Sequence, residues 1–134
     1  MTTDTIEPQR IDQTEFGENG NCQSACLAMM LGLEITDIPN FTTSGQTDIE
    51  RYKAMQDWLA ERGFQLLTFE TWTGIFWPPR GFCIGGGKSP RGIEHAVILK
   101  DGQLWHDPQP ERSGVEKVTT VDLLIPFYPW RVLP

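Results

Sequence analysis

A cysteine at the start of an apolar segment is the first place in this chain where chemistry is expected. Cys22 begins the run Cys22-Gln23-Ser24-Ala25-Cys26-Leu27-Ala28, and apolar spacing predicts a buried helix from about Cys22 to Leu31, with Asn21 as its cap and Gly32 as its stop. A thiol in the first turn of a helix faces the positive end of the helix dipole, which favours the nucleophilic thiolate. Cys22 is therefore a candidate nucleophile for attack on a carbonyl carbon.

The chain supplies a histidine and a carboxylate that could serve this thiol. His95 opens the apolar run 95–99, and His106 stands directly before Asp107-Pro108. The residues between these two segments, 100–103, have the composition of a hairpin turn, so His95 and Asp107 are expected on adjacent strands. His95 would then act as general base and acid, and Asp107 would orient its imidazole ring.

The register of this hairpin decides whether the two side chains meet, because successive side chains of a strand point to opposite faces. A two-residue loop would pair Asp107 with Ala96 and turn it away from His95. A three-residue loop over 101–103, or an equivalent bulge, pairs Asp107 with Val97 instead. We predict the three-residue loop. The side chains that then share one face are His95, Val97, Leu99, Trp105 and Asp107, and the opposite face holds His106, which is excluded from the triad.

The remaining elements indicate one α+β domain over residues 1–134, with residues 1–18 as an extended arm. Thr47 and Glu50 form a capping box for a second helix ending near Arg62. Strands are expected at 64–70, 82–84, 95–100 and 103–107, with one or two closing strands within 115–121 and 123–128. This order favours helices packed on one side of an antiparallel sheet, with the cysteine on the first, buried helix.

Composition narrows the functional classes. The net charge of −7 argues against a nucleic-acid partner, and no apolar run reaches the length of a membrane span. Three cysteines and an N-terminus without a signal-peptide pattern favour free thiols in the cytoplasm. No cofactor is indicated. A zinc site built from Cys22, Cys26, His95 and His106 is an alternative, but the predicted register points the two histidines apart.

Other residues carry weaker signals. Cys26 and Cys83 are expected in the core, because each lies in an apolar segment. The glycine-rich stretch 85–92 is expected to form a mobile lip beside His95, with Gly86 and Gly87 contacting substrate. Trp77, in an aromatic and proline-rich segment, is a candidate wall of a substrate groove, although simple packing would account for it equally well.

In combination, these motifs resemble those of papain-like cysteine peptidases. Asn21-Cys22-Gln23-Ser24-Ala25-Cys26-Leu27, His95-Ala96-Val97-Ile98-Leu99 and Asp107-Pro108 are most similar to the bacteriocin-processing double-glycine peptidases and related small proteins, many of them phage-encoded. The resemblance spans about residues 13–108. It implies a papain-like fold and a Cys22–His95–Asp107 triad.

The resemblance also implies a glutamine shortly before the cysteine as an oxyanion donor. Gln13 is the candidate, but it lies nine residues before Cys22, a longer spacing than is usual, so Asn19 and Asn21 stay open as alternatives.

The expected activity is acyl transfer from a peptide or protein amide. Hydrolysis by a peptidase, isopeptidase or amidase, deamidation and transglutamination all use the same triad, because only the acyl acceptor or leaving group differs. The alternative is a non-catalytic module of the same fold that binds or inhibits a protein partner.

Overall fold

The computed structural model describes residues 7–71 and 78–131, so Trp77 lies outside the described residues. Two α-helices are described, α1 (Cys22–Leu31) and α2 (Asp48–Ala60). Four 3₁₀ turns accompany them: η1 (Gly17–Asn19), η2 (Ile35–Asp37), η3 (Phe41–Thr43) and η4 (Pro129–Arg131). The strands are β1 (Phe64–Glu70), β2 (Phe82–Lys88), β3 (Glu94–Lys100), β4 (Gln103–His106) and β5 (Thr120–Pro126).

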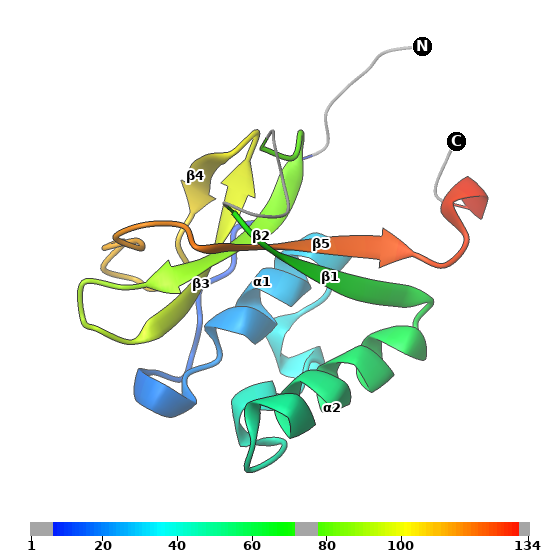
Figure 1. Cartoon of the computed structure of the whole chain (residues 1–134), viewed down its shortest axis with the longest axis horizontal. Helices are drawn as coiled ribbons and strands as arrows, with labels where there is room; N and C mark the ends of the chain where they lie inside the picture. The colour runs from blue at the N-terminus through cyan, green and yellow to red at the C-terminus, as the bar shows by residue number, and fades with distance from the viewer. Residues whose placement is uncertain (1–6, 72–77, 132–134) are drawn as a thin grey trace.

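The five strands form one antiparallel sheet in the order β1-β5-β2-β3-β4. Both α-helices pack on the same face of this sheet, with α1 against β2 and β3, and α2 against β1 (Figure 1). The predicted α+β layout is therefore confirmed. Within the described ranges, no helix has the length and apolar character needed to cross a membrane.

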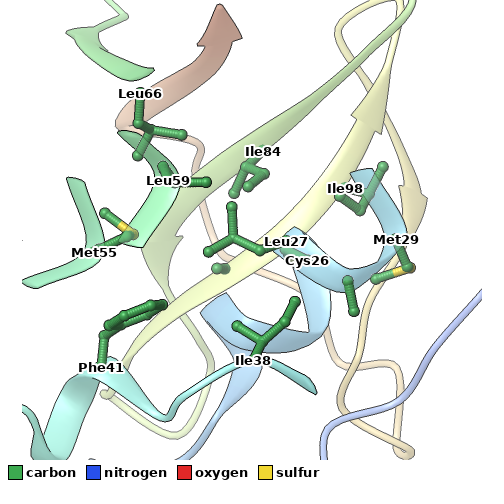
Figure 2. Packing of buried hydrophobic residues seen from close by; sticks show 12 residues of the cluster. Cys26, Leu27, Met29, Ile38, Phe41, Met55, Leu59, Leu66, Ile84 and Ile98 are labelled. Carbon is green, nitrogen blue, oxygen red and sulfur yellow. The ribbon is translucent and has the colours of Figure 1, made fainter. Parts of the chain in front are cut away.

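Helix α1 lies in the centre of the main core, as its apolar sequence predicts. Cys26 and Leu27 are fully buried between the sheet residues Ile84 and Ile98 and the other helical segments (Figure 2). The helix ends at Gly32, which adopts the left-handed conformation (φ 69°) that glycine tolerates without a steric penalty. The bounds of α1 agree with the prediction, and the burial of its body fixes the direction in which its first turn points.

The start of α2 also follows its sequence. The backbone N–H of Glu50 donates to the Thr47 hydroxyl (3.1 Å), which confirms Thr47 as the cap. The Glu50 carboxylate reaches back as predicted, but it accepts from the Thr47 hydroxyl (3.0 Å), whereas in a capping box it accepts from the backbone N–H. The helix ends at Ala60, two residues before the predicted end. A turn over 61–63 then leads into β1, with Gly63 at φ 84°.

The predicted mobile lip at 85–92 is wrong, because its first residues are part of the sheet. Strand β2 continues through Gly85, Gly86 and Gly87 to Lys88, and Gly87 pairs with His95. The physical reason is close packing: a Cβ on Gly86 would lie 2.5 Å from Thr120 Oγ1, and one on Gly87 would lie 2.1 Å from the Lys117 carbonyl oxygen. These glycines allow the 117–120 segment to lie directly on β2.

The second face of the sheet is thereby covered by chain rather than by a helix. A smaller core of Cys83, Val97, Leu99 and Val121 lies on this face, and Val115, Val118 and Leu123 pack against it. Gly87, which pairs with His95, lies against the Lys117 carbonyl of this covering segment.

We expect Gly87→Ala to lower the free energy of unfolding by about 2–3 kcal/mol, because the new methyl group meets an immovable backbone carbonyl. Gly86→Ala is the matched comparison, since the atom it meets belongs to a Thr120 side chain that can rotate; it should cost roughly 1 kcal/mol. Urea unfolding of both variants measures the difference. Equal costs would contradict this account of β2.

Candidate active site

The turn that brings the triad strands together is shorter than predicted. Lys100 pairs with Gln103, so the loop contains only Asp101 and Gly102, and the expected three-residue loop is wrong. Both loop residues have positive φ, 51° and 81°. This is the backbone of the type I′ turn, which matches the twist of antiparallel strands and for which Asp-Gly is a preferred sequence.

A bulge restores the register that the short turn would have lost. Leu99 pairs with Leu104, but the next residue on β3, Ile98, pairs with His106, so Trp105 is the extra residue on β4. One inserted residue reverses the alternation of all side chains beyond it. The chain therefore reaches Asp107 in the phase that the predicted loop was meant to provide.

The bulge places Trp105 on a different face from the one predicted. Its ring packs edge-on against Phe82 at 5.0 Å between centroids and contacts the main core, whereas Val97 and Leu99 belong to the opposite, smaller core. The Arg10 guanidinium lies 4.0 Å above the same indole ring. Trp105 thus anchors the N-terminal arm instead of sharing the face of His95.

His95 and Asp107 form a buried hydrogen bond, with His95 Nε2 2.6 Å from Asp107 Oδ1. The carboxylate also accepts the backbone N–H groups of Gln109 (2.9 Å, on Oδ1) and Gly114 (2.6 Å, on Oδ2). Burial alone would raise the pKa of Asp107, but these three donors outweigh it and lower that pKa. Asp107 is therefore held ionised and in one orientation beside the imidazole.

Cys22 lies close enough to the same ring to affect its pKa. Burial opposes charge on His95, yet hydrogen bonds to Asp107 and Cys22, with the negative charge of both groups, raise the pKa of His95 to about 9. Since Nε2 is taken by Asp107, Nδ1 is the nitrogen left for the thiol. The partly exposed Cys22 begins α1, where the free backbone N–H groups of the first turn also lie. The three predicted triad residues are brought together.

Gln13 reaches the start of α1 despite its long spacing from Cys22. Its buried Nε2 donates to the Glu15 carbonyl (2.9 Å) and lies 3.2 Å from the position of a Cβ on Gly20, two residues before the cysteine. Because Glu15 presents only a carbonyl oxygen here, the nitrogen must be the atom that points to it. An amide nitrogen carries a second hydrogen, which makes Gln13 a donor close to the first turn of α1.

The intervening residues fold into a closed loop, and Asn21 closes it. Asn21 Oδ1 accepts the backbone N–H groups of Thr14 and Glu15 (both 2.9 Å), its Nδ2 donates to Thr14 Oγ1 (2.9 Å), and its backbone N–H donates to the Glu15 carbonyl (3.2 Å). Asn21 does occupy the cap position, but its side chain makes no cap bond to α1, contrary to the prediction. Asn19, the third oxyanion candidate, lies in the 3₁₀ turn within this loop.

The other sequence candidates take no part in the triad. Cys26 and Cys83 are buried, and burial raises both of their pKa values, that of Cys83 to about 11. His106 Nε2 lies 3.0 Å from Asp12 Oδ1 and 3.2 Å from the Ile11 carbonyl oxygen, away from Cys22. Among residues 7–71 and 78–131, no group of three or more His, Cys, Asp or Glu could hold a metal ion.

Sequence reasoning missed the residues that support Asp107. The bond from the Gln109 N–H to Asp107 Oδ1 closes an Asx turn, which an aspartate before a loop indicates. The Gly114 N–H and the Arg112 side chain, which donates to the Asp107 carbonyl (2.8 Å), come from the far end of the same loop. No local sequence pattern predicts that the chain returns to Asp107 at these residues.

Comparisons with protein-family models, with curated proteins and with solved structures give no match, so the site is interpreted from its own geometry.

The raised pKa of His95 makes stability depend on pH. A folded pKa of about 9 exceeds the ordinary 6.5, so the stabilisation is fully present below pH 6.5 and is lost as pH rises through 9. Between pH 6.5 and 8.5 we expect the free energy of unfolding to fall by roughly 2 kcal/mol. Urea unfolding across this range measures it.

His95→Gln should flatten this pH dependence, whereas His106→Gln, the matched control on the neighbouring strand, should keep it. Both variants keep all three cysteines, whose ordinary pKa of about 8.5 lies at the upper limit, so the difference between their slopes isolates His95. An unchanged slope in His95→Gln would show that another group is responsible.

Proposed function

We propose that this protein is a papain-like, cysteine-dependent acyl-transfer enzyme that acts on amide bonds of peptides or proteins. One observation carries the proposal: a buried imidazole is hydrogen-bonded to Asp107, and Cys22 lies close enough to the same ring to raise its pKa. Nucleophile, proton carrier and orienting carboxylate are the three parts that amide attack by a thiol requires. A cysteine-bearing helix packed on an antiparallel sheet that carries the histidine fits the same class.

The reaction follows from the positions of these groups. The Cys22 sulfur attacks the amide carbon, and the proton held on His95 passes to the departing nitrogen as the carbon–nitrogen bond breaks, which leaves a thioester. His95 then accepts a proton from water as the water oxygen attacks the thioester, and the acid product leaves with the thiol regenerated. If an amine replaces water, the product is a new amide, so the same site supports hydrolysis and transfer.

Gln13 is the best placed of the oxyanion candidates. Its Nε2 lies beside Gly20 at the entrance to α1, whereas the Asn21 carboxamide already holds Thr14 and Glu15 with three bonds. The tetrahedral intermediate carries its negative oxygen close to the sulfur, where the Gln13 amide and the Cys22 backbone N–H could both donate. Asn21 then acts by folding the loop that brings Gln13 into reach.

Selective labelling tests the nucleophile. We expect iodoacetamide at pH 6 to alkylate Cys22 at least about tenfold faster than an ordinary exposed thiol, because His95 stabilises the thiolate as an ion pair. A peptide vinyl sulfone should label the same residue. Peptide mass spectrometry identifies the modified cysteine, and Cys26 and Cys83 serve as buried internal controls.

His95→Ala should remove the fast labelling at pH 6. If Cys22 in the wild type reacts no faster than a free thiol and is not labelled by the peptide electrophile, the enzyme proposal is wrong. The non-catalytic binding module is then the better interpretation, and binding to protein partners is the property to measure.

A second variant separates an enzyme from a module that only retains a reactive thiol. Gln13→Ala should lower the rate of acyl transfer by roughly 10²-fold, since an oxyanion donor is lost. The rate is measured as the acylation of Cys22 by an activated peptide thioester. Iodoacetamide alkylation should stay within about twofold, because displacement at an alkyl carbon forms no oxyanion. A parallel loss of both rates would indicate a displaced Cys22 instead.

A further inference from the structure

The loop that follows Asp107 is closed by one arginine side chain. Arg112 has a φ of 55°, in the left-handed region that non-glycine residues seldom adopt. From this position its Nη1 donates to the backbone carbonyls of Asp107 (2.8 Å) and Gln109 (3.0 Å). The guanidinium therefore joins the ends of the turn that supplies the Gln109 N–H to the Asp107 carboxylate.

The same guanidinium is held from outside the loop by the N-terminal arm. Both carboxylate oxygens of Asp12 accept from Arg112, the longer bond measuring 3.1 Å. Asp12 Oδ1 also contacts His106 Nε2, and the adjacent Gln13 N–H donates to the Pro108 carbonyl (2.9 Å). The hydrogen bond to Arg112 lowers the pKa of Asp12, so its charge persists at neutral pH. Arm and loop thus meet directly beside Asp107.

We propose that Asp12 and Arg112 are positioning residues, which hold the loop after Asp107 so that its carboxylate stays aligned with the His95 imidazole. This inference rests on the proposed function, because alignment of His95 matters for catalysis only if Cys22 is the nucleophile. Neither side chain contacts Cys22 or His95. Their effect passes through the Asp107 and Gln109 carbonyls to the backbone groups that bind the carboxylate.

The Asp12–Arg112 pair and its bonds to the loop after Asp107 are called the clasp below. The surroundings of Asp107 explain why this clasp is needed. A pocket of about 520 Å³ adjoins Asp107 and is lined by Arg10, Asp12, Trp105, His106 and Arg112. Asp107 itself is only 2% exposed. If the clasp opened, water could compete for the carboxylate, and the His95–Asp107 bond would weaken because its charge would no longer be confined to a dry site. The expected consequence is a lower pKa for His95.

A purely electrostatic effect of Asp12 and Arg112 predicts different changes in the pKa of His95 from those that positioning predicts. The sign of the change separates the two explanations. Removing the negative charge with Asp12→Asn lowers the pKa of His95 on either account. Arg112→Gln removes a positive charge, so simple electrostatics would raise the pKa of His95. Positioning predicts that it falls. Arg112→Lys keeps the charge but loses the forked geometry, so charge alone predicts no change and positioning again predicts a fall.

The test is an NMR titration of the His95 ring in a Cys22→Ala background. The charged groups facing this ring are Cys22 from α1 and Asp107 after β4, so removing the thiol leaves Asp107 as the partner. We expect the pKa of His95 to fall by about one unit in Asp12→Asn, Arg112→Gln and Arg112→Lys. Asp12→Glu, which keeps the charge and both oxygens, should retain most of the original value.

Asp48→Asn is the matched control, because it breaks an aspartate–arginine pair of the same chemistry, Asp48–Arg51, on the remote helix α2. It should leave the pKa of His95 unchanged. An unchanged or raised value in Arg112→Gln together with no change in Arg112→Lys would overturn the inference. If Arg112→Gln does not fold, Arg112→Lys decides alone.

Alkylation of Cys22 at pH 6, in protein that keeps the thiol, links the clasp to function. It should slow in Arg112→Lys, because a displaced imidazolium stabilises the Cys22 thiolate less. If the wild type shows no fast labelling of Cys22, the proposed function is wrong. The NMR titration of His95 still tests whether Asp12 and Arg112 position Asp107. If labelling is fast in the wild type and the clasp variants match it in both measurements, the clasp fails alone.

Discussion

The buried hydrogen bond between His95 and Asp107 is the constraint on which the site depends. A carboxylate with so little exposure requires several donors, since an unpaired buried charge is costly. Here a ring nitrogen and two backbone N–H groups supply them, and all three come from chain segments that must return to one point. The hairpin, the bulge and the 107–114 loop can be understood as the structure that satisfies Asp107.

The rest of the fold presents Cys22 to that imidazole. Burial of α1 in the main core, which also contains residues of the sheet and of α2, fixes the axis of the helix, and the thiol occupies its first turn. Strand β3 carries His95 beside Gly87, whose lack of a side chain lets the 117–120 segment cover the sheet. The proposed nucleophile and the proposed base are thus each carried by a regular element of the fold, a helix and a strand, which is how a small domain can position two side chains.

Much of this arrangement is predictable from sequence, for local reasons. The bounds of α1 follow from its apolar run and Gly32, the start of α2 from Thr47 and Glu50, and the meeting of His95 with Asp107 from strand alternation. The errors have non-local causes. A glycine-rich segment was expected to be mobile because nothing in its own sequence reveals that the Lys117 carbonyl lies against it.

The hairpin shows how two local rules can conflict and both be satisfied. Asp101-Gly102 specifies a two-residue turn, while the alignment of His95 with Asp107 requires the other phase of alternation. The prediction chose a longer loop over an equivalent bulge. The chain keeps the favoured turn and changes phase at Trp105, whose bulky ring gains a place against Phe82 and beneath Arg10. The bulge thus sets the register and anchors the arm at once.

The arm gives the unusual spacing before Cys22 a physical explanation. Asn21 ties Thr14 and Glu15 to the start of α1, so the additional residues form a closed loop and Gln13 still reaches Gly20. Distance along the chain is therefore a poor guide to whether Gln13 can serve as a donor. The neighbouring Asp12 binds Arg112 at the base of the Asp107 loop. Two consecutive arm residues thus contact the two ends of the site, and a displacement of the arm would disturb both together.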